Sequence, residues 1–217
     1  MADPKHQTET RAHILEAALK TFAHYGYAAA SVQQIVDAAE VSKPALYYYF
    51  ADKAELFGAI VDNAHDERYR LMKEASELGD TIAQKLEAIV AAAFEFSVRN
   101  QELMRLAFAT AFASGGESPG QTKCREKGRR NYEFVRALIE KGQASGELRT
   151  DYTADDLAMG IYGQLTTYIM VRLLLEDGVL DRDTARRIVE LFMSGAAAGS
   201  GSMTQRGADE LGTKETL

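Results

Sequence analysis

The side chains best suited to chemistry in this sequence stand together at residues 42–49. Lys43 offers a positive charge and three donor hydrogens, which suit a phosphate or a guanine edge. Tyr48 and Tyr49 carry hydroxyls that can donate to phosphates, and the methyl group of Ala45 suits contact with a thymine methyl. The segment therefore predicts a surface that contacts nucleic acid.

Two short helices joined by a three-residue turn would position these side chains. Ser31 with Gln34 three residues later predicts the start of the first helix, because each side chain can bond the other residue's backbone amide. Ser42 caps the second helix, and Pro44 in its first turn lacks an amide that would be unpaired there. The pair predicts a helix-turn-helix unit, whose second helix lies in the major groove of DNA.

Three consecutive tyrosines end the second of these helices. At about 100° per residue they point in three directions, so they cannot all face one core. We expect Tyr47 to join Leu46 and Phe50 inside, and the other two rings to be exposed. Exposed aromatic rings on so short a helix favour contact with a partner over simple filling of gaps between helices.

Bulk charge does not support nucleic-acid binding. The chain has a net charge of −7, and residues 1–53 contain five basic and six acidic side chains. No electrostatic footprint for DNA is present, so binding must depend on individually placed groups and on helix N-termini.

Apolar residues recur at helical spacing through nearly the whole chain, and alternating β-branched runs are absent. We predict an all-α protein with helices over residues 8–24, 31–39, 43–49, from 52 past 69, 81–99, 101–113, 121–144, 154–176 and 182–197. The N-terminal helix-turn-helix DNA-binding domain covers residues 1–53. A C-terminal helical domain covers 54–198, and a flexible tail covers 199–217.

The N-terminal part resembles the DNA-binding domain of TetR-family transcriptional regulators over residues 10–60. The resemblance is carried by Ile14-Leu-Glu-Ala-Ala18, Phe22, Tyr25-Gly-Tyr27, Ser31-Val-Gln-Gln-Ile-Val-Asp-Ala-Ala-Glu-Val-Ser-Lys-Pro-Ala-Leu-Tyr-Tyr-Tyr-Phe50 and Asp52-Lys-Ala-Glu-Leu56. It implies DNA contacts at Ser31, Gln33, Lys43, Pro44, Ala45, Tyr47, Tyr48, Tyr49 and Lys53, with Tyr47 also bracing the domain.

Two residues depart from the family pattern. Glu40 stands where the family usually has glycine in the turn, and a left-handed backbone there costs a residue with a side chain about 1 kcal/mol. Ala45 replaces the usual threonine or serine, which removes one polar contact. Both departures bear on the affinity for DNA and on base preference, without deciding whether binding is weaker, and neither removes the fold.

The resemblance implies that the C-terminal domain dimerises and holds an effector. The last two helices are apolar on more than one face, which favours a two-fold four-helix interface over plain core helices of a monomer. The interface residues we expect are Leu157, Ile161, Leu165, Ile169, Ile188 and Phe192.

The effector is expected to be a small and largely apolar molecule, and the pocket residues Phe94, Met104, Phe108, Phe112, Phe134 and Tyr162. The same aromatic stripe could be ordinary core. Arg99, Arg105 and Arg136 are candidate polar groups of the pocket, although a surface position is the simpler interpretation for each. The basic run at Lys123, Arg125, Lys127, Arg129 and Arg130 is most simply a solvated helix face.

We expect no catalytic residues, metal or cofactor. Cys124 is the only cysteine, and the four histidines form no His-Glu-x-x-His pair. The loop at 115–122 has the spacing of a phosphate loop but carries Gln121 in place of the lysine, and no strand precedes it. With no signal peptide and no apolar run long enough to span a membrane, the chain is predicted to be cytoplasmic.

The sequence predicts a homodimeric, ligand-responsive transcriptional regulator, a repressor released from its DNA operator by a small molecule. Three other classes stay open at this stage: an architectural DNA binder, a helical ligand-binding or interaction module without DNA binding, and an enzyme. Palindromic preference, sensitivity of DNA binding to Lys43 and Tyr48, and turnover of a pocket ligand would separate them.

Overall fold

The computed structural model describes residues 4–111, 121–175 and 178–197. These residues form nine α-helices and, apart from one isolated bridge between Leu148 and Ala197, no β structure. The helices are α1 (Pro4–Ala29), α2 (Val32–Ala38), α3 (Lys43–Tyr49), α4 (Lys53–Ser76), α5 (Ile82–Arg99), α6 (Gln101–Ala111), α7 (Gln121–Ala144), α8 (Ala154–Leu175) and α9 (Arg182–Ala196). The all-α prediction is confirmed. The predicted tail at 199–217, most of the loop at 115–122 and Phe112 lie outside the described residues.

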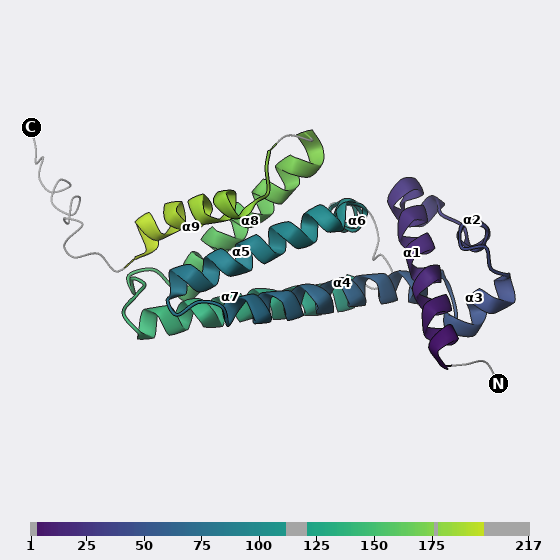
Figure 1. Cartoon of the computed structure of the whole chain (residues 1–217), viewed down its shortest axis with the longest axis horizontal. Helices are drawn as coiled ribbons and strands as arrows, with labels where there is room; N and C mark the ends of the chain where they lie inside the picture. Colours follow the sequence, from purple (N-terminus) through teal and green to yellow (C-terminus); the bar gives the residue numbers. More distant parts are fainter. Residues whose placement is uncertain (1–3, 112–120, 176–177, 198–217) are drawn as a thin grey trace, which may run out of the picture.

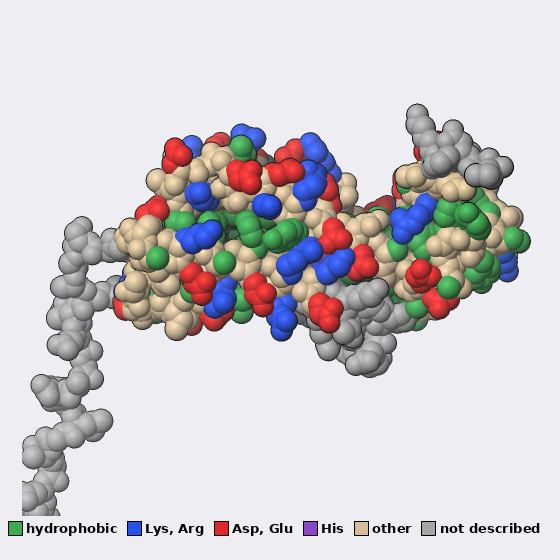
Figure 2. Space-filling view, turned by 90° about the horizontal axis from the view of Figure 1, so that it is seen from below, with side chains coloured by type: hydrophobic (Ala, Val, Ile, Leu, Met, Phe, Trp, Pro, Cys, Tyr) green, Lys and Arg blue, Asp and Glu red, His purple; other side chains and the backbone are tan. Residues whose placement is uncertain are grey.

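The helices divide between a small lobe and an elongated body (Figure 1). α1, α2 and α3 form the lobe, with α3 at the end of the molecule far from the body. α4 runs from the lobe along the length of the body, beside α7, and α9 lies on the opposite long side. Figure 2 shows the two parts joined through a narrow waist.

The helix starts in the lobe are fixed by the caps that the sequence predicts. The amide of Gln34 donates to the Ser31 hydroxyl at 3.2 Å, and the Ser31 amide donates to Gln34 Oε1 at 2.8 Å. The Ser42 hydroxyl accepts from the Ala45 amide, and the Asp52 carboxylate accepts from the amide three residues on. Caps of this kind each stabilise a helix by about 1 kcal/mol.

Two apolar clusters hold the molecule together. The body cluster contains Leu86, Ile89, Phe94, Ile139 and other buried residues of α4, α5, α7, α8 and α9. The lobe cluster contains residues of α1 to α4 and also takes in Phe96, Leu103 and Leu106 from α5 and α6. The lobe is therefore packed against the body through α6 as well as joined to it by α4.

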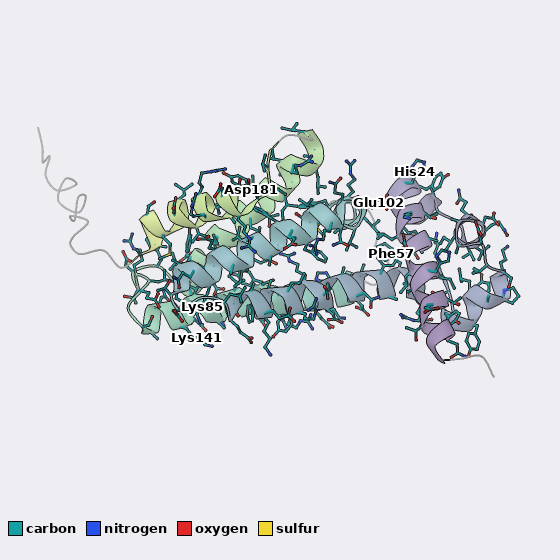
Figure 3. The ribbon with its side chains drawn as sticks, viewed as in Figure 1. His24, Phe57, Lys85, Glu102, Lys141 and Asp181 are labelled. Atoms are coloured by element: carbon teal, nitrogen blue, oxygen red, sulfur yellow. The ribbon has the colours of Figure 1, made fainter. Side chains whose placement is uncertain are left out.

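α4 belongs to both clusters. Its first turns place Leu56, Phe57 and Ile60 in the lobe core, and its last turns place Met72 and Ala75 in the body core. Figure 3 labels Phe57 where α4 meets α1, and its ring packs edge-on against Phe22 with 5.5 Å between the ring centres. A displacement of α4 in the body would therefore be passed directly to the lobe.

The six residues predicted for a dimer interface lie in the core of the protomer itself. Leu157, Ile161, Leu165, Ile169, Ile188 and Phe192 are all buried against the body cluster. The same helices expose other apolar residues instead, including Met159, Val171 and Leu174 on α8 and Leu191 on α9. The six predicted residues are thus not exposed for contact with a second copy, because apolar periodicity alone does not say which apolar residues of a helix lie inside the protomer.

Candidate DNA-binding surface and effector site

The exposed surface of α2 and α3 carries most of the predicted DNA contacts. Gln33, Lys43 and Pro44 are exposed, and Ala45 is half-buried beside them. Ser31 is exposed, but its hydroxyl is engaged in the cap of α2. The first turn of α3, where Ser42 leaves Lys43 and Pro44 facing solvent, is the part of the lobe best arranged to enter a groove of DNA.

The three tyrosines are arranged differently from the prediction. Tyr49 is half-buried and packs on the lobe cluster, whereas Tyr47 is 49% exposed and Tyr48 70% exposed. The expectation that Tyr47 lies inside is wrong, because the buried Leu46 sets the inner face of α3 and the residue three positions later shares that face. Tyr47 and Tyr48 therefore present their rings to solvent. Tyr48 packs edge-on against Tyr49, with 5.0 Å between the ring centres.

Glu40 adopts the left-handed backbone conformation that its place in the turn predicts, with φ at 50°. It is the only residue other than glycine with positive φ among those that the structure describes. The turn is held by the Val41 amide, which donates to the carbonyl of Val36 at 3.0 Å. A second carboxylate, that of Asp37, accepts from Gln33 Nε2 at 2.7 Å, so acidic groups flank the predicted DNA contacts.

Lys53 uses its ammonium group inside the protein. Its Nζ donates to the carbonyls of Tyr27 and Ala30, each at 2.9 Å, and lies 4.6 Å from the centre of the Tyr27 ring. These bonds tie the start of α4 to the end of α1, where Gly26 breaks the helix with φ at 76°. The structure thus gives Lys53 a bracing position, and its DNA contact stays a prediction.

A network of charged groups joins α4 to α7. Lys127 Nζ lies 2.9 Å from Asp66 and 3.3 Å from Asp62, and Arg130 Nη2 lies 2.9 Å from Asp66. These ion pairs and hydrogen bonds correct the interpretation of the basic run as a simple solvated face, at least for these two of its members. Sequence patterning could not pair them, because Asp66 and Lys127 stand 61 positions apart on two different helices.

Next to this network, His65 is half-buried against α7, with its ring 3.7 Å from the position a side chain at Gly128 would occupy. Burial lowers the pKa of His65 below its usual range. The positive charges of Arg68, Lys127 and Arg130 lower the pKa further, and Asp62 opposes them. Each of these charged residues lies on α4 or α7, so the protonation of His65 reports on the contact between those helices.

The described residues among those predicted for the effector pocket line neither of the two cavities reported below. Phe94 is fully buried in the body core, while Met104, Phe108, Phe134 and Tyr162 are half-buried around that core. Phe134 packs edge-on against Tyr69 of α4, and the Tyr162 hydroxyl accepts from Arg68 at 2.7 Å. The assignment of these residues to an effector pocket stays a prediction.

Two cavities lie at other places on the described part of the body. The larger, 920 Å³, is a groove between α4 and α5 that reaches the start of α9. Its apolar lining residues are Leu71, Ala75, Leu78, Ala88, Ala91, Ala92, Val98 and Leu180, and its polar and charged ones are Glu74, Gln84, Glu87, Glu95, Arg99, Asp181 and Arg182. The smaller, 250 Å³, lies where α5, α6 and α8 meet, and Arg105 lines it. Of the three arginines considered from the sequence, Arg99 and Arg105 thus border cavities, and Arg136 instead pairs with Glu140.

Two family models match the chain. The first, described as bacterial regulatory proteins of the TetR family, matches residues 14–60. The second, described as a tetracyclin repressor-like C-terminal domain, matches residues 83–198, which is more than half of the chain. The chain belongs to the TetR family. The resemblance seen at residues 10–60 is confirmed, and it extends to the helical body.

Relatives in sequence are transcriptional regulators. The activator FasR of Mycolicibacterium smegmatis is 33% identical over 115 residues, which are 53% of this chain and 52% of FasR. The repressor SCO4008 of Streptomyces coelicolor is 26% identical over 197 residues, covering 83% of this chain and 95% of the relative. The chain is accordingly a TetR-family transcriptional regulator with an N-terminal DNA-binding domain.

Solved structures share the fold. FadR from Bacillus subtilis, solved in complex with stearoyl-CoA, superposes with a TM-score of 0.75 over 84% of this chain and 97% of its own, at 19% identity. The arrangement of lobe and body described above is therefore a fold that this protein shares with FadR.

In the part of the chain that the structure describes, no three or more histidine, cysteine, aspartate or glutamate side chains are grouped so as to hold a metal ion. Nor does any helix in these ranges have the length and apolar character needed to cross a lipid bilayer.

Proposed function

We propose that this chain is a homodimeric, cytoplasmic repressor that binds a two-fold DNA operator and leaves it when a largely apolar small molecule binds the body. The observation that carries the DNA-binding half is the solvent-facing first turn of α3, with Lys43, Pro44, Tyr47 and Tyr48 exposed at the far end of the lobe. Repression, as opposed to activation, is supported by the relative SCO4008, which is described as a transcriptional repressor and matches this chain over most of its length.

The exposed apolar residues of α8 and α9 support a dimer. The apolar side chains exposed on α8 include Met159, Val171 and Leu174. On α9, Leu191 is 65% exposed. A Cβ atom added at Gly163 would have no other atom within 4 Å, so a partner helix could approach the backbone there closely. Two copies of this helix pair would bury the exposed residues in a four-helix interface.

The groove between α4 and α5 is our proposed effector site. Eight of its fifteen lining residues are apolar, and four of these are alanines. The groove follows α5 from Gln84 to Val98 and is walled by α4, the helix shared by both cores. Its length along α5 is about 21 Å at 1.5 Å per residue, which suits a long unbranched hydrocarbon chain. The stearoyl-CoA bound by FadR, a protein of the same fold, supports a ligand of this kind.

Occupation of the groove would act on DNA binding through α4. A ligand that separates α4 from α5 changes the angle at which α4 enters the lobe, and in a dimer it changes the distance between the two α3 helices. Recognition helices about 34 Å apart fit successive turns of one DNA face, so a changed spacing lowers operator affinity. A coupling of about 1–3 kcal/mol is typical of such switches.

The DNA-binding half is tested by substitution on α3. Lys43→Ala should weaken binding to a selected operator by about tenfold or more, because it removes a charged donor to a base or phosphate. Tyr48→Ala should weaken binding as well. Lys20→Ala on α1 is the matched control, since Lys20 is exposed and pairs with Glu16 away from α3. Equal operator affinity for all the variants in an electrophoretic shift would exclude this surface.

A further inference from the structure

Arg11 of α1 packs against the end of α3. Its guanidinium carbon lies 5.1 Å from the ring centre of Phe50, the residue that caps the C-terminus of α3. Phe50 is 2% exposed, whereas the arginine is exposed, so the guanidinium group separates the ring from solvent. Figure 1 shows α3 beside the part of α1 nearest the N-terminus, in agreement with this contact.

The donor hydrogens of Arg11 are not used inside the protein. Among the residues that the structure describes, none forms a hydrogen bond or ion pair with this side chain, whose contact is with the Phe50 ring. A guanidinium group that rests on an aromatic ring keeps its N–H donors around its edge. Glu9, two residues earlier, points about 200° away around the helix. Asp52 and Glu55, which follow Phe50, each accept a hydrogen bond from a backbone amide.

Few cations of the lobe are available to DNA. The described lysine and arginine side chains within residues 1–53 are Arg11, Lys20, Lys43 and Lys53. Lys20 pairs with an acid of its own helix at 2.8 Å, and Lys53 donates to backbone carbonyls. Arg11 and Lys43 remain, and they lie at opposite ends of α3. The helix rises about 10 Å between Lys43 and Phe50.

We propose that Arg11 binds a phosphate of the DNA backbone at the edge of the groove that α3 enters. This inference rests on the proposed function and adds to it a contact from α1. A recognition helix that places its first turn on the bases brings its other end towards the sugar-phosphate backbone. The major groove is about 12 Å wide, so a cation about 10 Å along α3 from Lys43 lies near its edge.

The contact with Phe50 would prepare Arg11 for this role. An arginine can give two parallel hydrogen bonds to phosphate oxygens, and the ring restricts the side chain before DNA arrives. Since Phe50 directly follows the last residue of α3, a phosphate held by Arg11 fixes the position of that helix in the groove. Phosphate contacts carry no sequence information directly, so Arg11 acts on affinity and register rather than on base preference.

The test is the salt dependence of binding between the full-length protein and a DNA duplex selected from a random library. Arg11→Gln should lower the affinity by a factor on the order of ten. It should also reduce the slope of log affinity against log salt concentration by about 0.9 for each Arg11 in the complex, because one phosphate is no longer neutralised. The loss should be equal for a duplex with one base pair of the site changed.

Two further variants separate charge from packing. Arg11→Lys keeps the charge and should keep most of the slope, whereas Arg11→Met keeps an unbranched chain over Phe50 and should lose as much slope as Arg11→Gln. Lys20→Gln is the matched control, because Lys20 is paired with Glu16 and stands about 180° around α1 from Arg11. It should behave as the wild type.

The possible results distinguish this contact from the proposed function. A wild-type slope in Arg11→Gln and Arg11→Met would overturn the phosphate contact, even if the affinity falls through lost packing. A loss confined to one changed base pair would overturn it as well, because Arg11 would then read a base. If Lys43→Ala weakens binding and the Arg11 variants do not, only the Arg11 contact is wrong. If the wild type binds no selected duplex, both proposals are wrong. Thermal melts show whether each variant is folded.

Discussion

Glu40 adopts a left-handed backbone conformation that favours glycine, although it carries a side chain. Its φ of 50° lies in the region that glycine adopts without penalty, and the residue stands in the turn between α2 and α3, the two helices proposed to contact DNA. The sequence predicted this strain because a glycine is expected there. We expect Glu40 to lower the stability of the lobe and, if the proposed DNA contacts are made, to place negative charge near the phosphates.

Replacement of Glu40 by glycine should have two measurable effects. Glu40→Gly should raise the free energy of unfolding by about 1 kcal/mol, because glycine has no Cβ atom to clash in the left-handed conformation. It should also tighten operator binding, since a repelling charge is removed. Urea denaturation and an anisotropy titration with labelled operator measure the two quantities.

Glu40→Ala is the matched control, because it removes the charge and keeps the strain. We expect it to tighten DNA binding without raising stability. A gain in stability for Glu40→Ala as large as that for Glu40→Gly would show that the backbone conformation is not the cause.

The helix α4 packs in the lobe core at one end and in the body core at the other, and a charged network holds its middle against α7. In this network Asp62 and Asp66 pair with Lys127, and Asp66 also pairs with Arg130. His65, which stands between the two aspartates in the sequence, is half-buried. Because burial and the surrounding cations lower the pKa of His65, the folded protein binds a proton there less readily than the unfolded chain does. The contact between α4 and α7 should therefore weaken in acid.

The lowered pKa of His65 predicts how the stability of the folded protein depends on pH. With a folded-state pKa below the unfolded value near 6.5, the contribution of His65 is fully present above about pH 6.5 and is lost as the pH falls through the folded pKa. The free energy of unfolding should fall as the pH decreases below about 6.5, and His65→Gln should reduce that slope. Urea denaturation at several pH values measures it.

His24→Gln provides the control, because His24 is an exposed histidine of α1 outside the network. It should keep the slope of the wild type. An unchanged slope in His65→Gln would mean that other groups govern the acid response. Asp66 responds only in stronger acid, because the hydrogen bonds and charges of Lys127 and Arg130 hold its pKa below the usual value.

The elements also show where sequence reasoning succeeds. The ends of α3, Lys43–Tyr49, and the caps at Ser31 and Ser42 were predictable because they depend on residues three positions apart. Which tyrosine of α3 lies inside depends on how the helix is rotated against its neighbours, and there the prediction was wrong. The ion pair between Asp66 and Lys127 joins residues 61 positions apart, so only the packed structure could identify it.

For the whole molecule, the prediction of lobe and body follows from the family resemblance together with helical periodicity. Resemblance and periodicity did not, however, identify which faces of the body helices lie at the surface. α8 carries apolar residues on its exposed side as well as its buried side, whereas the exposed side of α9 is mostly charged apart from Leu191. The residues we assigned to the interface, such as Leu165 and Ile188, lie in the protomer core. The cavities were equally unpredictable. The groove between α4 and α5 depends on how these two helices pack and not on a sequence motif.

The proposed dimer is tested at Leu191. Leu191→Glu should convert a dimer to a monomer in light scattering after gel filtration, because burying an unpaired charge in an apolar interface costs several kcal/mol. Operator affinity should fall with it, since one protomer contacts only half of a two-fold site.

The matched control is Leu78→Glu. Leu78 is 80% exposed, follows α4 and lies outside the pair of helices proposed to form the interface. This variant should remain dimeric. If Leu191→Glu also remains dimeric, the interface lies elsewhere on the molecule.

The central claim is that two copies of the α3 surface, held at a fixed distance, read one DNA site. Footprinting of the full-length protein on DNA selected from a random library tests this most directly. We predict a two-fold symmetric sequence with two protected major-groove segments about 34 Å apart on one face, lost in Lys43→Ala and kept in Lys20→Ala. Protection without sequence symmetry, or a footprint unaffected by Lys43→Ala, would contradict the account.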